Sequence, residues 1–156
     1  MEKHTEEYIL RPMVLDDISQ IIAIEKKSFP TPWSAYAFTC ELCDNEFAYY
    51  FVLSLENNPS AVIGYGGMWI ITDEAHITNI AVTPDYRGKR LGERLMEGLM
   101  ALAKAKQVVR MTLEVRLSNE PAQRLYKRIG FASAGIRPGY YIDTNEDALI
   151  MWKELV

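Results

Sequence analysis

One stretch decides the fold of this chain: residues 79–92, which read Asn79-Ile80-Ala81-Val82-Thr83-Pro84-Asp85-Tyr86-Arg87-Gly88-Lys89-Arg90-Leu91-Gly92. It begins as an apolar strand, turns at Pro84, and passes through a loop with two glycines and three basic residues into a helix. Glycine lets the backbone approach a ligand closely, and the first N–H groups of a helix lack partners within it. Such a loop suits a pyrophosphate, although the same residues also fit a solvated basic turn before a surface helix.

Regular patterns continue on both sides of this stretch. Downstream, leucines at positions 91, 95, 99 and 102 repeat at helical spacing through Lys106. The later elements predicted there are a strand over Met111–Val115, a helix over Asn119–Ile129, and strands over Phe131–Ile136 and Ala148–Leu155. Those predicted upstream are strands over Tyr8–Arg11, Phe47–Leu55, Ala61–Ile71 and Glu74–Val82, and helices over Leu15–Phe29 and Ser34–Cys43.

The order of these elements predicts the fold class. Three consecutive strands with short turns favour an antiparallel meander, with Asn57-Asn58-Pro59 as the first turn. The alternation of strand and helix that follows favours parallel pairing. We therefore predict an α/β (α+β) fold, in which a mixed sheet carries helices on both faces.

Length and charge narrow the class of protein. The chain has 156 residues, and we expect a single domain over residues 1–156 with a flexible start at residues 1–7. The net charge of −4 argues against a nucleic-acid partner. No apolar run approaches the ~20 residues of a membrane span, and the polar start is unlike a signal peptide. We therefore expect a cytoplasmic protein with no membrane partner.

The two cysteines, Cys40 and Cys43, have the C-x-x-C spacing of redox and zinc sites. A zinc site needs a second pair of ligands, and the chain offers only His4 and His76. The segment around the cysteines has the pattern of a short amphipathic helix. We interpret both as reduced structural thiols and expect no metal.

The order of elements and the loop resemble the GNAT superfamily of acetyl-coenzyme A-dependent N-acetyltransferases. These enzymes have a pyrophosphate loop of the form Q/R-x-x-G-x-G/A, which here reads Arg87-Gly88-Lys89-Arg90-Leu91-Gly92. Arg90 stands where the motif usually has glycine, so its side chain must point away from the phosphates or contact them. The resemblance implies a mostly antiparallel sheet of about seven strands, with the pyrophosphate at these six residues and at Glu93.

The resemblance also implies where the rest of the cofactor lies. In the GNAT superfamily the fourth and fifth strands part, and the pantetheine arm of acetyl-coenzyme A lies between them. Backbone groups of Ile80, Ala81 and Val82 then hold this arm, and Asn119 reaches the cofactor from the start of the next helix.

Glu114 is the candidate general base. In Met111–Val115 the apolar residues alternate with Thr112 and Glu114, and a carboxylate on a central strand is costly to bury unless it is paired or wet. It could be a strand-end glutamate paired with an arginine such as Arg116, or a base that takes a proton from an amine.

Tyr126 is the candidate general acid. Its position on the apolar face of a helix, beside Leu125 and Ile129, also fits a core aromatic with a satisfied hydroxyl. The resemblance favours the catalytic role, because GNAT enzymes place a tyrosine here that protonates the departing thiolate.

The second half of the chain resembles one branch more narrowly, the bacterial ribosomal-protein-alanine N-acetyltransferases. The strings that carry this likeness are residues 79–82, 113–119, 130–131, 135–141 and 146–151, with Phe29-Pro30-Thr31-Pro32-Trp33-Ser34 in the first half. The resemblance implies that the acceptor is the N-terminal alanine of a small-subunit ribosomal protein, and that Trp33, Tyr140 and Tyr141 line its groove. These aromatic residues also fit an exposed patch or ordinary core packing.

Two alternatives stay open at this point. The acceptor could be another N-terminus, a lysine or a small amine such as a polyamine, because the sites for acetyl-coenzyme A are shared across the superfamily. The domain could also bind acyl-coenzyme A without turnover, an interpretation that Arg90 favours and that the presence of both Glu114 and Tyr126 opposes.

Overall fold

The computed structural model describes residues 7–156, so all but Glu7 of the start predicted to be flexible lies outside the described residues. Seven strands make up one sheet: β1 (Tyr8–Pro12), β2 (Ala48–Leu55), β3 (Asn58–Ile71), β4 (Glu74–Val82), β5 (Arg110–Arg116), β6 (Ala132–Tyr141) and β7 (Glu146–Glu154). The α-helices are α1 (Ile18–Ser28), α2 (Ala35–Cys43), α3 (Leu91–Ala105) and α4 (Glu120–Arg128), and two short 3-10 turns are η1 (Leu15–Asp17) and η2 (Pro84–Tyr86). None of the helices in residues 7–156 combines the length and apolar character needed to cross a bilayer.

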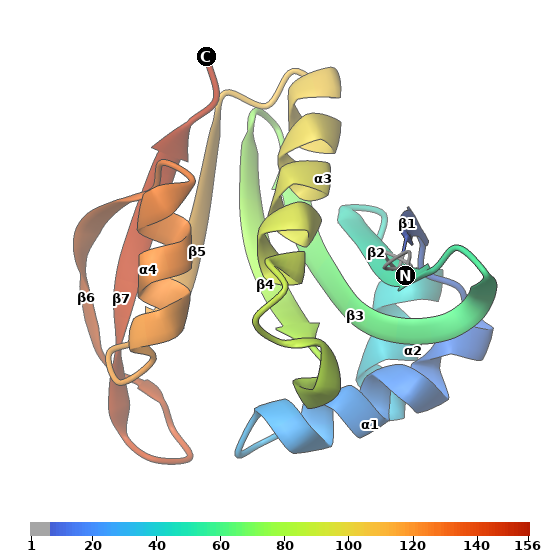
Figure 1. Cartoon of the computed structure of the whole chain (residues 1–156). Coiled ribbons are helices and arrows are strands. Elements are labelled where there is room, and N and C mark those ends of the chain that lie inside the picture. Colours follow the sequence, from blue (N-terminus) through green and yellow to red (C-terminus); the bar gives the residue numbers. More distant parts are fainter. Residues whose placement is uncertain (1–6) are drawn as a thin grey trace, which may run out of the picture.

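The strands lie in the order β1-β2-β3-β4-β5-β7-β6 (Figure 1). Every neighbouring pair is antiparallel except β4 and β5, which run parallel. This confirms the predicted mixed and mostly antiparallel sheet of seven strands. The crossover between the two parallel strands is α3, as the α/β pattern of the sequence requires.

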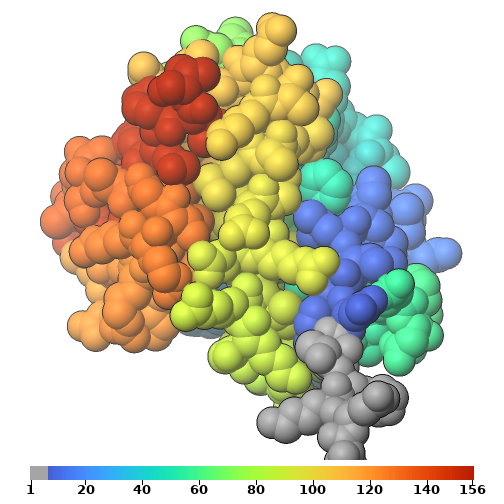
Figure 2. Space-filling model, turned by 45° about the horizontal axis from the view of Figure 1, so that its top comes forward, coloured from blue at the N-terminus to red at the C-terminus, as the bar shows by residue number. Residues whose placement is uncertain are grey.

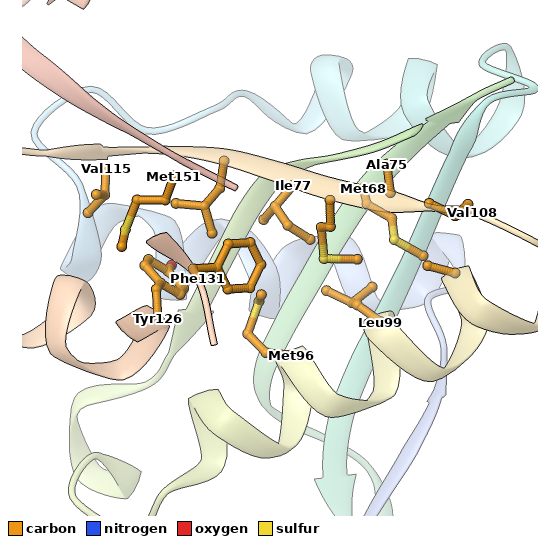
Figure 3. Close-up of a cluster of buried hydrophobic side chains, with 13 residues drawn as sticks. Met68, Ala75, Ile77, Met96, Leu99, Val108, Val115, Tyr126, Phe131 and Met151 are labelled. Atoms are coloured by element: carbon orange, nitrogen blue, oxygen red, sulfur yellow. The ribbon is translucent and has the colours of Figure 1, made fainter. Parts of the chain in front are cut away.

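Helices cover both faces of the sheet, as predicted. On one face, α3 and α4 pack Met96, Leu99 and Tyr126 against Ile77 and Met151 of the strands (Figure 3). On the other face, α1 and α2 pack Ile21, Ile24 and Phe38 against Val52 and Tyr65. Along β3, Met68 belongs to the first core and Tyr65 to the second. We call these two sides of the sheet the α3/α4 face and the α1/α2 face.

The parallel strands β4 and β5 part soon after they start. They pair only at Glu74↔Arg110, Ala75↔Met111 and His76↔Thr112, although β4 runs on to Val82 and β5 to Arg116. In Figure 1 the two strands lie together near the top and separate toward the bottom. Beyond His76, β4 still pairs with β3, up to Val82. Within residues 7–156, no strand pairs with the edge of β4 that faces β5 over this part. The split between the fourth and fifth strands is thus confirmed.

Close packing on the α1/α2 face depends on a glycine. A Cβ at Gly67 would lie 2.0 Å from the ring of Tyr50 on the neighbouring strand. The Tyr50 ring is buried, and its hydroxyl is 2.9 Å from Thr78 Oγ1. Glycine at position 67 therefore leaves the room that this ring occupies.

Some predicted boundaries were wrong. The β2–β3 hairpin turns at Glu56-Asn57, so β3 begins at Asn58 and contains Pro59. A two-residue loop is the commonest hairpin connection, and proline is tolerated near the start of a strand. The helix predicted from Leu15 begins as a 3-10 turn and becomes α1 only at Ile18. Strand β6 runs to Tyr141 rather than Ile136.

Candidate active site

A cavity of about 570 Å³ lies where β4 and β5 part. Its walls come from the α1–α2 connection, β3, β4, β5, α4 and the β6–β7 hairpin. Glu25 and Trp33 reach it from the α1/α2 face, and Ala122 and Tyr126 reach it from the α3/α4 face. The cavity therefore extends through the split in the sheet, and side chains from both faces line it.

Glu114 projects from β5 into this cavity. Its neighbours Leu113 and Val115 are buried in the α3/α4 core, so the strand alternation turns Glu114 toward the other face. The Glu114 side chain is only 7% exposed, and its Oε2 lies 2.5 Å from His76 Nε2. Its Oε1 lies 3.8 Å from an Arg137 guanidinium nitrogen. A carboxylate held in this way can accept a proton from a group in the cavity.

Glu114 does lie near an arginine, but this is Arg137 and not the Arg116 that the sequence suggested. The guanidinium of Arg116 instead binds Asp143 at 2.8 Å and Glu146 at 3.4 Å, on the β6–β7 hairpin. Residues 114 and 116 share a face of the strand, but Arg116 lies at its end, where it reaches the hairpin more easily than it reaches back along the strand.

His76 is a site residue that sequence reasoning considered only as a possible zinc ligand. It stands on the last paired position of β4 before the split, opposite Thr112, and lines the cavity. Its side chain is 33% exposed, so it connects the buried Glu114 carboxylate to solvent. The signal was present in the sequence, because His76 is polar between the apolar residues Ala75 and Ile77 of a central strand.

Tyr126 both packs in the α3/α4 core and lines the cavity. Its ring lies 6.0 Å from that of Phe131, and Figure 3 shows the two side by side above α4 and α3. Burial raises the pKa of the Tyr126 hydroxyl, and the neighbouring Tyr141 adds to the rise. The phenol therefore stays protonated at neutral pH and can donate a proton.

The predicted pyrophosphate loop connects η2 to the N-terminus of α3. Gly88 has φ +83° and Arg90 has φ 60°, so the chain is left-handed at both positions. Arg90 caps α3, and the first helical bond runs from Arg94 N–H to Arg90 O at 3.2 Å. The amides at the start of α3 are thus available to an anion, and a Cβ at Gly88 would meet no atom within 4 Å. Figure 2 shows this region in yellow-green at the surface, between α4 in orange and the N-terminal part in blue.

The side chains of the loop have other partners in the structure. Arg87 donates from Nε to Val82 O at 3.1 Å and from a terminal nitrogen to Ser28 Oγ at 3.1 Å. Lys89 Nζ lies 5.0 Å from the centre of the Tyr86 ring. The fit to a pyrophosphate therefore rests mainly on backbone groups and on the exposed Arg90. Glu93, also predicted to bind the cofactor, pairs with Arg128 at 3.2 Å and so joins α3 to α4.

Two further predicted cofactor positions lie at the cavity. Asn119 caps α4, because its Oδ1 accepts a hydrogen bond from Ala122 N–H at 3.2 Å, and it lines the cavity. Ile80 also lines the cavity, whereas Ala81 and Val82 continue β4 along its unpaired edge and pack into the neighbouring cores.

All three predicted acceptor residues lie on the cavity wall: Trp33, Tyr140 and Tyr141. The rings of Tyr140 and Tyr141 are 5.0 Å apart and nearly perpendicular. Burial raises the pKa of Tyr141 to about 12, and Arg116, 4.0 Å from its ring centre, opposes the rise. Thr31 and Asp143 also line the cavity, and Thr31 Oγ1 donates to Asp143 at 3.0 Å, so the α1–α2 connection and the β6–β7 hairpin touch.

Glu25 is a buried carboxyl at the cavity that sequence reasoning missed. It accepts hydrogen bonds from Trp33 N–H at 3.1 Å, from Asn79 Nδ2 at 3.4 Å and from the Tyr65 hydroxyl. Burial raises the pKa of Glu25, and these three hydrogen bonds oppose the rise. Glu25 thus joins the α1–α2 connection to β3 and β4. It follows Ile24 on α1, and a glutamate at the edge of an apolar helix face was the available signal.

The cysteines lie away from this cavity, on α2. Cys40 is half-buried and Cys43 is exposed, and both are free thiols. Within residues 7–156, no group of three histidine, cysteine, aspartate or glutamate side chains is placed to hold a metal ion.

Comparison with known proteins identifies the family. The model of the acetyltransferase (GNAT) family matches residues 18–131. A Bacillus subtilis (strain 168) protein, provisionally named a [ribosomal protein bS18]-alanine N-acetyltransferase, is 48% identical over 92% of this chain and 93% of its own. The Escherichia coli (strain K12) enzyme of that name is 36% identical over 86% of this chain and 89% of its own.

A solved structure agrees with the sequence comparison. The crystal structure of the ribosomal-protein-S18-alanine N-acetyltransferase from Escherichia coli superposes with a TM-score of 0.85, over 96% of this chain and 94% of that one, at 32% identity. The family match covers the sheet split, the loop before α3 and both candidate catalytic residues. The chain therefore belongs to the GNAT family of acetyltransferases, whose acetyl donor is acetyl-coenzyme A, as the sequence predicted.

Proposed function

We propose that this protein transfers an acetyl group from acetyl-coenzyme A to the N-terminal α-amine of a protein, and that its acceptor is the N-terminal alanine of a ribosomal protein. The relatives from Bacillus subtilis and Escherichia coli are named for this acceptor. One observation carries the mechanism: Glu114 and Tyr126 reach the same cavity from opposite faces of the sheet. Ribosomal proteins are made in the cytoplasm, so the proposed reaction belongs there.

Glu114 and Tyr126 have complementary tasks in this proposal. When bound, acetyl-coenzyme A supplies a thioester whose carbonyl carbon the amine attacks directly. A bond from nitrogen to this carbon forms and the bond from carbon to sulfur breaks. Glu114 accepts the proton that the amine loses, and the Tyr126 hydroxyl gives a proton to the sulfur. Neither cysteine takes part, since no covalent enzyme intermediate is required.

His76 gives the proton a route away from Glu114. Its Nε2 contacts the buried carboxylate, and a third of its side chain is exposed. Glu114 can therefore pass the proton to His76, which exchanges it with solvent. Arg137 lies on the other side of the carboxylate, with a guanidinium nitrogen 3.8 Å from Glu114 Oε1.

The proposed loop residues hold the cofactor by its phosphates. The amides at the start of α3, with Gly88, Lys89 and Arg90, bind the pyrophosphate, and the open edge of β4 at Ile80, Ala81 and Val82 binds the pantetheine arm. Asn119 lies at the cavity beside this route. Trp33, Tyr140 and Tyr141 line the acceptor side.

An α-amine is the acceptor that this arrangement suits best. Its unperturbed pKa is about 7.7–8.0, so one carboxylate can deprotonate it near neutral pH, whereas a lysine amine at about 10.4 needs more help. His76 and Arg137 both contact the Glu114 carboxylate.

The test is thiol release from acetyl-coenzyme A with a short peptide that begins Ala-Arg, beside the same peptide with a blocked N-terminus. We expect release with the free peptide only. Glu114→Gln and Tyr126→Phe should each lower kcat by about 10²–10⁴, the usual contribution of a general base or acid, and leave cofactor affinity nearly unchanged. Matched controls are Glu120→Gln, on the exposed side of α4, and Tyr36→Phe, on the exposed side of α2.

Other outcomes would redirect the proposal. Turnover of a polyamine or a lysine peptide without turnover of the Ala-Arg peptide would contradict α-amine acetylation. Tight binding of acetyl-coenzyme A with no transfer to any amine would identify a binding module. An unchanged rate in Tyr126→Phe would remove this residue from the chemistry.

A further inference from the structure

Three side chains lie in a row across the α1/α2 face, at the point where β4 and β5 begin to separate: Trp69, His76 and Glu114. Trp69 of β3 is paired with His76 of β4, and His76 is paired with Thr112 of β5, two residues before Glu114. The His76 ring lies 2.5 Å from the Glu114 carboxylate on one side and meets the Trp69 ring at 80° on the other, with 6.2 Å between ring centres. The His76 ring therefore lies between Trp69 and Glu114, the proposed base.

The Trp69 indole is held in place from behind. Its Nε1 donates to Glu41 Oε2 at 2.7 Å, and the same oxygen accepts a hydrogen bond from the Tyr50 hydroxyl at 3.1 Å. Asn45, just after the C-terminus of α2, also donates to the Glu41 carboxylate at 3.3 Å and helps to hold it in place. A half-buried indole with its N–H bound and its edge packed on His76 has little freedom to swing out of the cavity.

A second tryptophan is fixed in a similar way on the opposite wall. The Trp33 backbone N–H donates to the buried Glu25, and its ring packs at 5.3 Å from Phe38. Both Trp33 and Trp69 line the cavity. Two indoles therefore line the cavity: that of Trp69 is bonded to a carboxylate through its own N–H, and that of Trp33 is held by its backbone and by Phe38.

We infer that Trp69 determines the size of the first residue that the enzyme accepts, an inference that rests on the proposed α-amine acetylation. An α-amine at Glu114 carries its own Cα and side chain into the space beside His76, and Trp69 closes that space. A first residue without a side chain (glycine) or with a small one (alanine, serine) fits in front of the indole. Leucine and methionine side chains meet it, because the ring and its Glu41 anchor have little freedom to move away.

Competition between acceptor peptides tests the inference. Two peptides, identical except for Ala or Leu at the first position, are acetylated together, and the ratio of their kcat/KM values is measured for each variant. Because both peptides meet the same enzyme, a general loss of activity cancels. We expect Trp69→Ala to shift the ratio at least about tenfold toward the leucine peptide, the discrimination that a hydrophobic pocket gives for a methylene or more.

The control is a tryptophan outside the cavity. Trp152→Leu removes a half-buried indole from β7, where Arg110 lies 5.8 Å from the ring, and should keep the wild-type ratio. Glu41→Gln retains an acceptor oxygen for the Trp69 N–H and should also keep it. Glu41→Ala removes the anchor but leaves the indole, and should shift the ratio in the direction of Trp69→Ala by a smaller amount.

The outcomes separate the two proposals. An active wild type, with the same ratio in a folded Trp69→Ala variant, would overturn the role of Trp69 alone. If Trp69→Ala does not fold, Trp69→Phe carries the test, because the smaller ring should still relax selection and an unchanged ratio would overturn the inference. A wild type that acetylates neither peptide overturns the proposed function, and the inference with it.

Discussion

Replacement of Arg90 by glycine tests the conformation of the loop before α3. Arg90 has φ 60° and ψ 28° at the cap of the helix, where its Cβ is crowded by the following carbonyl. The left-handed conformation costs an L-residue roughly 1–2 kcal/mol, and glycine avoids this cost. The GNAT motif usually has glycine here, so the perturbation restores the family residue.

Two further effects of the substitution oppose each other. Glycine makes the unfolded chain more flexible, which destabilises the folded state by roughly 0.5–1 kcal/mol. Removal of a positive charge from a helix N-terminus adds roughly 0.3–1 kcal/mol of stability, because the helix dipole is positive there. These two effects nearly cancel, so the relief of backbone strain decides the sign, and we expect Arg90→Gly to stabilise the protein by about 1 kcal/mol. This corresponds to a rise in Tm of about 2–4 °C for a chain of this size.

Arg90→Ala separates backbone strain from charge. It removes the same charge but retains a Cβ, so in thermal and urea unfolding Arg90→Gly should be the more stable of the two variants. If the arginine side chain also contacts the phosphates, both variants should raise the KM for acetyl-coenzyme A by a similar factor. A glycine variant no more stable than the alanine variant would refute the assignment of strain at this position.

Two stability predictions concern other parts of the fold. Asp17 accepts hydrogen bonds from Arg11 at 2.7 and 2.8 Å and from Val14 N–H at 2.8 Å. Burial alone would raise the pKa of Asp17, but these hydrogen bonds outweigh burial and lower it. Its contribution is therefore present above the unfolded pKa of about 3.9 and lost as pH falls through the folded pKa. Asp17→Asn should cost about 1.5–3 kcal/mol at pH 7 and less at pH 3 in urea titrations, and an equal cost at both pH values would contradict this. Gly67→Ala should lower the free energy of unfolding by at least about 1–3 kcal/mol, because the new Cβ overlaps the buried Tyr50 ring, and an unchanged urea midpoint would show that the ring can move.

The sequence predicted the fold well where periodicity was strong. The helical leucines after Arg90 gave α3 almost to its last residue, and the alternation around Glu114 gave β5 and the face to which the carboxylate turns. Strand β6 was harder to predict, because it is an exposed edge strand that carries Pro138 and two glycines with positive φ. Exposure removes the apolar alternation by which a strand is recognised in a sequence.

The candidate site was only partly predictable for a different reason. Glu114 and Tyr126 follow from local pattern and family resemblance, but the partners of Glu114 depend on strand register. His76 and Arg137 come from β4 and β6, and only the paired sheet brings them to the carboxylate. Arg116 is closer to Glu114 in sequence, but it binds Asp143 and Glu146 of the β6–β7 hairpin, nearly thirty residues further along the chain.

The parting of β4 and β5 has a consequence for the lifetime of the protein. A ligand that bridges the two strands binds the folded chain and has no equivalent site on the unfolded one. By mass action, acetyl-coenzyme A at a hundredfold excess over its Kd stabilises the folded state by about 2.7 kcal/mol, which lowers the unfolded fraction about a hundredfold. Proteases that act on the unfolded chain then find less of it when the donor is abundant. On the proposed function, the amount of enzyme in a cell should therefore rise with the concentration of acetyl-coenzyme A.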